Sequence, residues 1–474
     1  MFEETEAIER LRGDNMHGLM LAGTSSNVGK TTATMGLMAA FKAKGCHVLP
    51  AKTGPDYIDP MFHQFVTDEP SVNLDTWIVS PERIKTLFYR RLKETDLAIV
   101  EGVMGLYDGN VSGSEDGSSA FLAKTLGLPV FLIIDGRGMA MSAAALVMGY
   151  VNFDPEVHIA GVIVNRIKSQ THFELLKNAI ETHTGVPCVG WIPEDPALTV
   201  GSRHLGLIPA DELPKLKETV QRAGELTAAH VDLDRMLEYA EITPQTGAAD
   251  PFAAQAGRFS DLTVGVAWDP AFNFYYHDNF TALKTLGVKL VPFSPLKDKG
   301  VPENIDALYI GGGFPEVFGQ AFSDNQAMRR DIKAKLEAGL PCFAECGGLM
   351  VLTDSLQNKD GRRYDGIGFL PAKTVMTKRL QHFGYVTVSA QLDGREFEFR
   401  AHEFHHSRVE ASDAIPEIYR ITKVKNQSVE HWRGGYVKSH TLAGYPHLHF
   451  YAEGADEFLI ALLEKAQQIK GAGK

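Results

Sequence analysis

A ten-residue segment near the N-terminus, GTSSNVGKTT (23–32), constrains the fold of this chain more than any other stretch. It follows a short apolar run at 19–22 and precedes a helical pattern. Glycines at such a turn let backbone N–H groups surround phosphate oxygens, and the helix N-terminus adds a favourable dipole. The lysine would reach the β- and γ-phosphates, and the following threonine would bind Mg²⁺. The segment predicts a P-loop rather than an ordinary glycine turn.

All ten residues of this loop are predicted to bind ATP. They are Gly23, Thr24, Ser25, Ser26, Asn27, Val28, Gly29, Lys30, Thr31 and Thr32. Five residues, not the usual four, separate the two glycines of the motif. This spacing resembles dethiobiotin synthetases, which use ATP to phosphorylate a carboxyl-type group. It also resembles MinD and ParA ATPases, so the loop leaves the reaction open.

Acidic residues follow later strands of the same predicted sheet, in KTGPDYIDP (52–60) and EGVMGLYDG (101–109). Carboxylates at the carboxyl ends of parallel strands face the ligand crevice, and oxygen ligands suit Mg²⁺. We predict Thr31, Asp56 and Glu101 as Mg²⁺ ligands; the alternative for each acid is a helix cap or turn. Asn165, after the apolar run 159–164, is predicted either to bond the adenine or simply to end a strand.

The spacing of apolar runs predicts an α/β protein with two domains. Runs without polar alternation, about 30 residues apart, predict strands that are covered on both faces of a parallel sheet. A helical pattern at 231–241 precedes a stretch rich in Ala, Gly and Pro. We predict an ATP-binding domain at 1–241, a linker at 242–258 and a second α/β domain at 259–474 whose pattern changes to short alternating strands after about residue 365. The predicted strands are 19–22, 47–51, 97–100, 130–134, 159–164, 188–192, 262–267, 289–293, 307–310 and 341–344.

The stretch PCFAECGGLMVL (341–352) is typical of a strand, a sharp turn and a helix, with Cys346 at the turn. A tight turn exposes a nucleophile, and a helix N-terminus lowers the pKa of a thiol. Ala344 replaces the first glycine of the usual G-x-C-x-G pattern. We predict Cys346 as a nucleophile rather than a buried structural cysteine, the role expected of Cys188 and Cys342.

A thiol nucleophile needs a base, and YPHLHF (445–450) offers His447 and His449 on opposite faces of a strand end. We predict His447 as the base. Backbone N–H groups of Gly312, Gly313 and Gly347 are predicted to form the oxyanion hole. These features resemble a class I glutamine amidotransferase domain of the cobyric acid synthase type. Such domains lack the acid found two residues after the histidine in ordinary glutaminases, and His449 stands there.

The composition excludes several classes of protein. A formal charge of −12 argues against a general nucleic-acid binder. Four cysteines in 474 residues are too few for a disulfide framework, and no apolar run is long enough to span a membrane. The N-terminus is charged and has no signal sequence, so we expect a cytoplasmic enzyme.

With both halves in view, the chain resembles the cobyrinic acid a,c-diamide synthase family nearly from end to end. The resemblance rests on eight motifs in order: GTSSNVGKTT, KTGPDYIDPMFH, EGVMGLYDG, VIVNR, GGGFPE, FAECGGLM, HEFHHSR and YPHLHF. It implies that Cys346 hydrolyses glutamine through a thioester. It also implies that ATP and Mg²⁺ phosphorylate a carboxylate of a tetrapyrrole, and that ammonia displaces the phosphate at the c and a side chains in turn.

A polycarboxylate macrocycle needs cationic contacts on an otherwise acidic chain, and basic residues gather between 376 and 408. Solvated surface charges or core histidines are the alternative, and a zinc site is disfavoured because adjacent histidines of a strand point apart. Substrate contacts are predicted for Lys52, Asp56, Tyr57, Asp59, Asp108, Lys378, Arg379, His382, His402, His405 and His406.

Two other readings stay open. The same chemistry acts on Ni-sirohydrochlorin or hydrogenobyrinic acid in related enzymes, and sequence separates these substrates poorly. An ATPase switch of the MinD/ParA type predicts ATP hydrolysis without glutaminase activity. A homodimer is possible.

Overall fold

The computed structural model describes residues 15–109, 115–198, 213–412, 414–425 and 428–472. It divides into two compact units, 1–248 and 249–474, and the division falls inside the segment predicted as a linker. The segment 1–14, from which we predict no signal sequence, lies outside the described residues. None of the helices in the described ranges is both long and apolar enough to cross a membrane.

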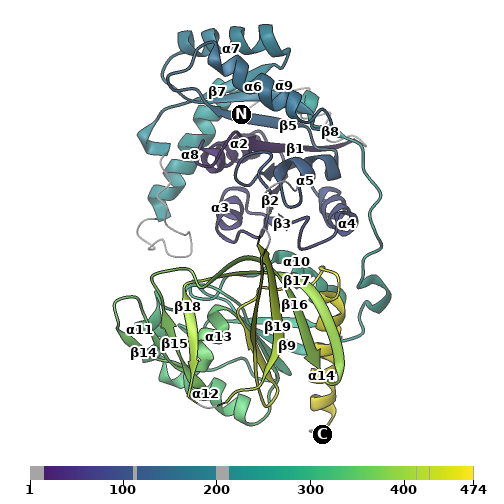
Figure 1. The fold of residues 1–474 in the computed structure, drawn as a ribbon, viewed down its shortest axis with the longest axis vertical. Coiled ribbons are helices and arrows are strands. Elements are labelled where there is room, and N and C mark those ends of the chain that lie inside the picture. Colours follow the sequence, from purple (N-terminus) through teal and green to yellow (C-terminus); the bar gives the residue numbers. More distant parts are fainter. Residues whose placement is uncertain (1–14, 110–114, 199–212, 413, 426–427, 473–474) are drawn as a thin grey trace. The chain divides into compact units, whose positions relative to one another are not determined.

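The N-terminal unit is a twisted, mainly parallel sheet with helices against it (Figure 1). The strand order is β3-β2-β4-β1-β5-β6-β7, and β8 pairs antiparallel with β1. Its strands are β1 (Met16–Gly23), β2 (Val48–Thr53), β3 (Val72–Leu74), β4 (Leu97–Glu101), β5 (Val130–Asp135), β6 (Ile159–Ile167), β7 (Cys188–Pro193) and β8 (Glu241–Ile242). Its helices are α2 (Lys30–Ala43), α3 (Ile58–Thr67), α4 (Pro81–Leu92), α5 (Ser119–Leu126), α6 (Ser142–Phe153), α7 (Gln170–Thr184), η1 (Pro196–Leu198), α8 (Leu213–His230) and α9 (Leu233–Tyr239).

The strands of this unit are buried on both faces, which explains why polar and apolar residues do not alternate along them. β2 and β4 are buried at every position, as expected for strands covered on both faces. The six runs predicted in this half correspond to β1, β2, β4, β5, β6 and β7. Sequence analysis missed β3, whose three residues are too few to show a period, so Glu101 ends the fourth strand rather than the third.

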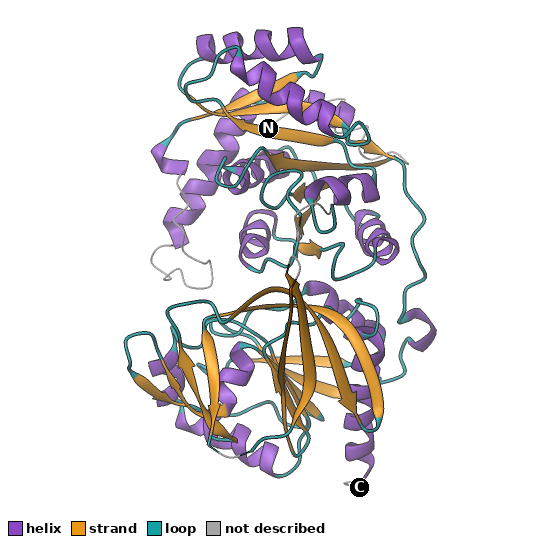
Figure 2. Cartoon of the chain, in the orientation of Figure 1, coloured by secondary structure: helices purple, strands orange, loops and turns teal. Residues whose placement is uncertain are grey.

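The C-terminal unit combines a parallel half-sheet with an antiparallel extension (Figure 2). Its main sheet has the order β10-β9-β11-β12-β21-β20-β19-β16-β17, and a second sheet has the order β14-β13-β15-β18. The strands are β9 (Thr263–Ala267), β10 (Lys289–Phe293), β11 (Ala307–Ile310), β12 (Cys342–Glu345), β13 (Thr353–Gln357), β14 (Arg363–Asp365), β15 (Leu370–Met376), β16 (His382–Leu392), β17 (Arg395–His405), β18 (Ser407–Ala411), β19 (Glu417–Lys425), β20 (Ser428–Lys438) and β21 (Thr441–Gly444). The helices are η3 (Ala253–Gln255), α10 (His277–Thr285), α11 (Gly319–Asp324), α12 (Gln326–Glu337), α13 (Gly347–Leu352) and α14 (Ala455–Ala472).

These two units confirm the predicted α/β class. The prediction of short strands after residue 365 is wrong for the main sheet, where β16, β17 and β20 have eleven residues each. These long strands pair in antiparallel register, and a neighbouring strand supplies hydrogen bonds along their length.

The segment predicted as a linker is anchored at both ends. The N–H of Ala248 donates to the carbonyl of Glu82 at 3.0 Å, and Thr86 Oγ1 donates to the carbonyl of Ala248 at 2.5 Å. Phe252 is buried within the C-terminal unit, where its ring lies 5.0 Å from that of Tyr451. The chain between residues 248 and 252 is therefore the short connection between two docked stretches.

Candidate active sites

The predicted P-loop joins β1 to α2, with a glycine at the point where the helix begins. Gly29 caps α2 in the left-handed region with φ 95°, and a side chain there would collide with the amide of Asn165. The ammonium of Lys30 curls back to the carbonyl of Ser25 at 3.0 Å and also contacts the carbonyl of Met104. Burial, followed by the charge of Lys52, lowers the pKa of Lys30. The loop thus holds a cation near the backbone concavity where phosphates bind.

Two residues at the end of β6 hold the P-loop in place through hydrogen bonds. Asn165 Nδ2 donates to the carbonyl of Val28 at 2.7 Å, while Asn165 Oδ1 accepts from the N–H of Arg166. Arg166 in turn donates to the carbonyl of Asn27 at 2.8 Å and pairs with Asp135 at 2.7 Å. Both the nitrogen and the oxygen of the Asn165 amide already form hydrogen bonds within the protein. This geometry fits a residue that supports the P-loop better than it fits the predicted bond to adenine.

A cavity beside the P-loop extends to the segment after β7. Pro193, Asp195 and Leu198 line it together with Thr31 and Arg166. Sequence analysis did not select the residues after β7; their position at the carboxyl end of a parallel strand is the signal that points to them.

A buried charge cluster lies under the loop. Glu101 accepts from Thr31 Oγ1 at 2.8 Å, and it contacts Lys52 Nζ at 3.0 Å and His63 Nε2 at 2.7 Å. Lys52 also pairs with Asp59 at 2.6 Å. Burial opposes ionisation of Glu101, but Lys52 and His63 hold its pKa below the usual value. Burial and then Glu101 raise the pKa of Asp59 to about 8.

This cluster changes the interpretation of Lys52. Its side chain is only 3% exposed and is held between two carboxylates, so the structure makes it part of the internal framework rather than a substrate contact. His63, which sequence analysis missed, is fully buried against Glu101. Its place in KTGPDYIDPMFH was the available signal.

The other acids predicted here make local turns. Asp56 accepts from the N–H of Ile58 at 2.8 Å at the start of α3, next to Tyr57, the helix cap. Asp108 accepts from the N–H of Gly105 at 2.9 Å. Asp56 matches the turn alternative, and Asp108 closes a turn after β4.

Cys346 stands at a strained turn between β12 and α13. Its φ of 45° and ψ of −98° are unusual for a residue with a side chain. The N–H of Cys346 donates to the carbonyl of Gly444 at 2.7 Å, and the N–H of Gly348 donates to the carbonyl of Gly311 at 3.0 Å. These bonds fix the turn between β21 and the glycine run after β11, as expected for a nucleophile elbow.

Glycines let the loops around Cys346 approach closely. A Cβ on Gly347 would lie 3.1 Å from the backbone nitrogen of Gly313. A Cβ on Gly312 would collide with the ring carbon Cε1 of His447. The structure therefore brings the three glycines predicted for the oxyanion hole together with the predicted base.

Burial outweighs the expected effect of the helix N-terminus on the thiol: the N–H of Gly347, at the start of α13, lowers the pKa of Cys346 as expected, but the net shift is upward. Burial raises the pKa of Cys346, and the carboxylates of Glu316 and Glu403 raise it further. α13 has only six residues, so its dipole is small, and the thiol is surrounded by low-dielectric protein. A proton acceptor must therefore take the thiol proton during reaction.

The two histidines after β21 occupy different surroundings, as their alternation predicts. The backbone of His447 pairs with that of His402, its N–H donating to the carbonyl of His402 at 2.9 Å. Burial, then His402 and His405, lower the pKa of His447 to about 3. His449 instead packs on Tyr276, with its Nε2 3.9 Å from Asp278. His447 is therefore neutral and has a ring nitrogen that can accept a proton, but burial also makes it a weak base.

The predicted basic patch divides into exposed and buried members. Lys378 and Arg379 are exposed before β16, and the ring of His382 stacks on Trp432 with centroids 4.0 Å apart. His402 and His406 are partly exposed.

His405 does not belong to the predicted substrate-binding patch, because it is buried. Its ring stacks on that of Tyr445, with the ring centroids 3.6 Å apart. It cannot contact a large macrocycle from that position. No group of three or more His, Cys, Asp or Glu in the described ranges is arranged to hold a metal ion.

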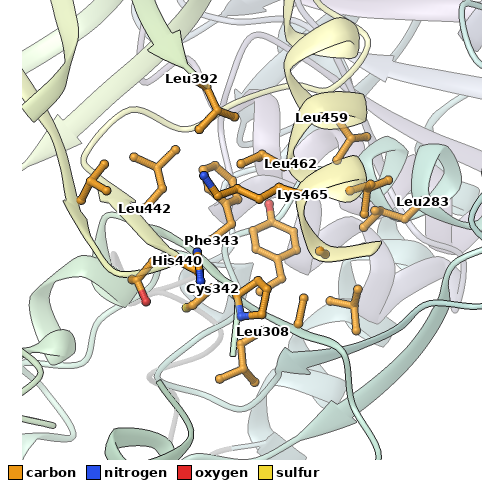
Figure 3. Close-up of a pocket in the computed structure, with 18 of the residues that line it drawn as sticks. Leu283, Leu308, Cys342, Phe343, Leu392, His440, Leu442, Leu459, Leu462 and Lys465 are labelled. Carbon is orange, nitrogen blue, oxygen red and sulfur yellow. The ribbon is translucent and has the colours of Figure 1, made fainter. Parts of the chain in front are cut away.

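Cys342 and Cys188 are buried, as predicted for structural cysteines. Figure 3 shows Cys342 among Leu308, Leu442 and Leu459 in an apolar cavity between the sheet and α14. Burial raises the pKa of both thiols, and for Cys188 the value is about 12. Neither has the strained turn of Cys346.

Comparisons with known proteins agree with this pair of sites. Residues 19–208 match a CobQ/CobB/MinD/ParA nucleotide binding domain, and residues 263–455 match a CobB/CobQ-like glutamine amidotransferase domain. A protein of Listeria innocua named cobyrinate a,c-diamide synthase is 42% identical over 465 residues, covering 97% of this chain and 100% of the relative. A protein of the same name from Streptococcus sanguinis is 45% identical over 452 residues, covering 94% and 98%. The chain is an amidating ligase that belongs to the cobyrinate a,c-diamide synthase family.

Proposed function

We propose that this enzyme transfers nitrogen from glutamine to the a and c side-chain carboxylates of cobyrinic acid, through a phosphorylated carboxylate. The name of its relatives supports this substrate. The chemistry rests on one observation above all: a single chain holds both a P-loop, with Thr31 bonded to Glu101, and a strained Cys346 elbow packed against the loop that faces His447. Phosphorylation is required because carboxylate oxygen is a poor leaving group and phosphate a good one.

In the nucleotide site, the P-loop backbone and Lys30 would hold the phosphates of ATP. Thr31 Oγ1 and Glu101 Oε1 lie 2.8 Å apart, and such an oxygen pair fits Mg²⁺, which takes its other ligands from water and phosphate. Bound Mg²⁺ would neutralise phosphate charge. Lys52 and His63 hold the Glu101 carboxylate in its ionised form beside Thr31.

In the glutaminase site, His447 would accept the proton of Cys346, and the thiolate would attack the amide carbon of glutamine. The carbonyl oxygen would turn toward the backbone N–H groups of Gly313 and Gly347. The thiol proton would pass to the leaving ammonia, and water would then release glutamate from the thioester.

The edge formed by the start of β16 and the end of β17 would contact the macrocycle. Phe383 and Phe404 are opposite each other there and are 51% and 45% exposed. Lys378 and Arg379 are exposed in the turn that leads into β16. An apolar plane next to cations suits a flat ring that carries carboxylates.

The Cys346→Ser variant tests the proposed function. We expect it to lose glutamine-supported amidation while amidation with ammonia and ATP continues. A panel of cobyrinic acid, hydrogenobyrinic acid and Ni-sirohydrochlorin, followed by mass gain, identifies the acceptor. An ATPase that releases no glutamate from glutamine would instead support a MinD/ParA-like switch. Light scattering on the purified chain tests whether it forms a homodimer.

A further inference from the structure

β17 carries two polar residues on the face that should hold only apolar ones. Its inward positions alternate along the strand as Phe397, Phe399 and Ala401, all buried. The next two inward positions are Glu403 and His405, which are also buried. A buried carboxylate without donors is expensive, so its presence in a core position calls for a partner.

Glu403 lacks that partner within the described chain. It is 1% exposed, and neither of its carboxylate oxygens has a hydrogen-bond donor. The basic side chain beside it is His405, whose Nε2 lies 3.8 Å from Glu403 Oε2, beyond hydrogen-bond distance.

The tautomer of His405 explains why it does not serve as the donor. His405 Nδ1 lies 2.7 Å from the carbonyl of Ser407, and a carbonyl only accepts, so Nδ1 carries the proton. In the neutral ring Nε2 is then an acceptor, and it too has no partner. Stacking on Tyr445 fixes the ring in this orientation.

Three buried acceptor atoms therefore lie in one cavity: both oxygens of Glu403 and Nε2 of His405. The cavity is lined further by His382, Trp432 and Tyr445. A primary ammonium has three N–H donors on one atom, which matches this set of acceptors. A metal ion is disfavoured, since no metal-binding group is arranged among the described residues.

The cavity lies beside the nucleophile. Tyr445, on its wall, directly follows Gly444, whose carbonyl accepts from the N–H of Cys346 at 2.7 Å. Glu403 is also close enough for its charge to act on the thiol of Cys346, whereas the groups acting on His447 are His402 and His405. Glu403 is therefore better placed to contact the substrate that binds at Cys346 than to act as the acid that orients His447.

We propose that Glu403 and His405 bind the α-ammonium group of glutamine and so orient its side-chain amide toward Cys346. This inference rests on the proposed function. Glutamine carries the ammonium four bonds from its amide carbon, and fixing that end restricts which amides reach the thiol. Ordinary amides without an α-ammonium group would leave the three acceptors unpaired, which selects against them.

The test measures glutamate release for wild type, Glu403→Gln and the matched control Glu398→Gln. Glu398 lies on the same strand with its side chain on the exposed face. The substrates are L-glutamine and 4-carbamoylbutanoate, which is glutamine without its amino group. Losing a charge-assisted bond should raise the KM for glutamine about tenfold to a hundredfold in Glu403→Gln. The kcat, the KM for 4-carbamoylbutanoate and ammonia-supported amidation should change little, and Glu398→Gln should behave as wild type.

Other outcomes overturn the inference in distinguishable ways. If wild type releases no glutamate, the proposed function fails and this inference with it. If wild type is active and Glu403→Gln keeps its KM for glutamine, only the ammonium site is wrong. A lower kcat at constant KM would assign Glu403 to proton transfer instead. Should Glu403→Gln fail to fold, Glu403→Asp serves instead, because its shorter side chain keeps the negative charge but moves it away from the ammonium group. The same rise in the KM for glutamine alone is then expected.

Discussion

The carboxyl group of Glu345 accepts a hydrogen bond of 2.8 Å from the backbone N–H of Leu448. Glu345 immediately precedes the cysteine of the elbow, and Leu448 lies between His447 and His449. The second oxygen of Glu345 accepts from Tyr309 Oη at 2.8 Å. One buried side chain thus ties the strand that carries the thiol to the segment that carries the predicted base.

Removing this tie should impair glutaminase activity selectively. Glu345→Ala leaves the buried N–H of Leu448 without an acceptor, at a cost of about 1–3 kcal/mol, and frees the segment that carries His447. We expect the kcat for glutamate release to fall about tenfold, as one to two kcal/mol of lost alignment implies. Glu345→Gln keeps an oxygen acceptor and should retain most activity. Equal rates in both variants would show that the bond does not position the base.

The same carboxyl group predicts a pH dependence of stability. Burial raises the pKa of Glu345 to about 8. Between its unfolded value and this one, the folded protein keeps a proton that the unfolded chain has released, so the free energy of unfolding decreases as pH rises through the window and levels off above it. Glu345→Gln lacks this term. Urea denaturation at about pH 5 and about pH 8 should show that the free energy of unfolding falls more for wild type than for Glu345→Gln at the higher pH. An equal change in both proteins would contradict this.

Sequence analysis identified the sites that lie on short, local motifs. The P-loop, the Cys346 elbow and the alternation of His447 with His449 each depend on neighbouring residues, so the chain order reveals them. Glu345, Glu403 and His63 were missed because their roles depend on contacts with distant parts of the chain: Leu448, the surroundings of Cys346 and Glu101.

One of these residues left a usable signal. The stretch REFEFRAHEFH (395–405) alternates polar and apolar residues from Glu396 to Ala401, and counting by two from Phe397 places Glu403 on the inward face. An acid in that phase is a strong exception to binary patterning. The burial of Lys52 had no such signal, because a lysine after a strand is equally compatible with an open crevice.

Gly312 gives a test of loop packing near His447. A Cβ there would collide with the histidine ring, so Gly312→Ala should displace the ring and abolish most glutaminase activity. Amidation with ammonia should continue. The control is Gly149→Ala in α6, where a Cβ meets nothing within 4 Å. That variant should keep both activities and gain about 0.5–1 kcal/mol of stability from helix propensity. A Gly312→Ala variant that keeps its glutaminase activity would show that His447 is not the base of the reaction.

Thr31 tests the nucleotide site. Thr31→Val keeps the shape of the side chain but removes the hydroxyl that donates to Glu101. Without it, amidation should fall at least about tenfold with either glutamine or ammonia, since one charge-assisted contact is worth about 1.5–3 kcal/mol. Glutamate release from glutamine without ATP should stay unchanged, because Thr31 belongs to the other unit. A loss confined to glutamine as nitrogen donor would contradict the assignment.

The exposed aromatic pair on β16 and β17 tests macrocycle binding. Phe383 and Phe404 form an edge-to-face pair with centroids 5.5 Å apart, and such exposure of two phenylalanines is costly unless a ligand covers them. Phe383→Ser should raise the KM for the macrocycle by about tenfold, as burial of one aromatic side chain is worth about 1.5–3 kcal/mol. The KM values for ATP and glutamine should stay constant. Val424, which is 62% exposed on β19, provides the control, and Val424→Ala should leave all three values unchanged. If Phe383→Ser instead changes the KM for glutamine alone, this edge serves the glutaminase site, and the macrocycle must bind elsewhere.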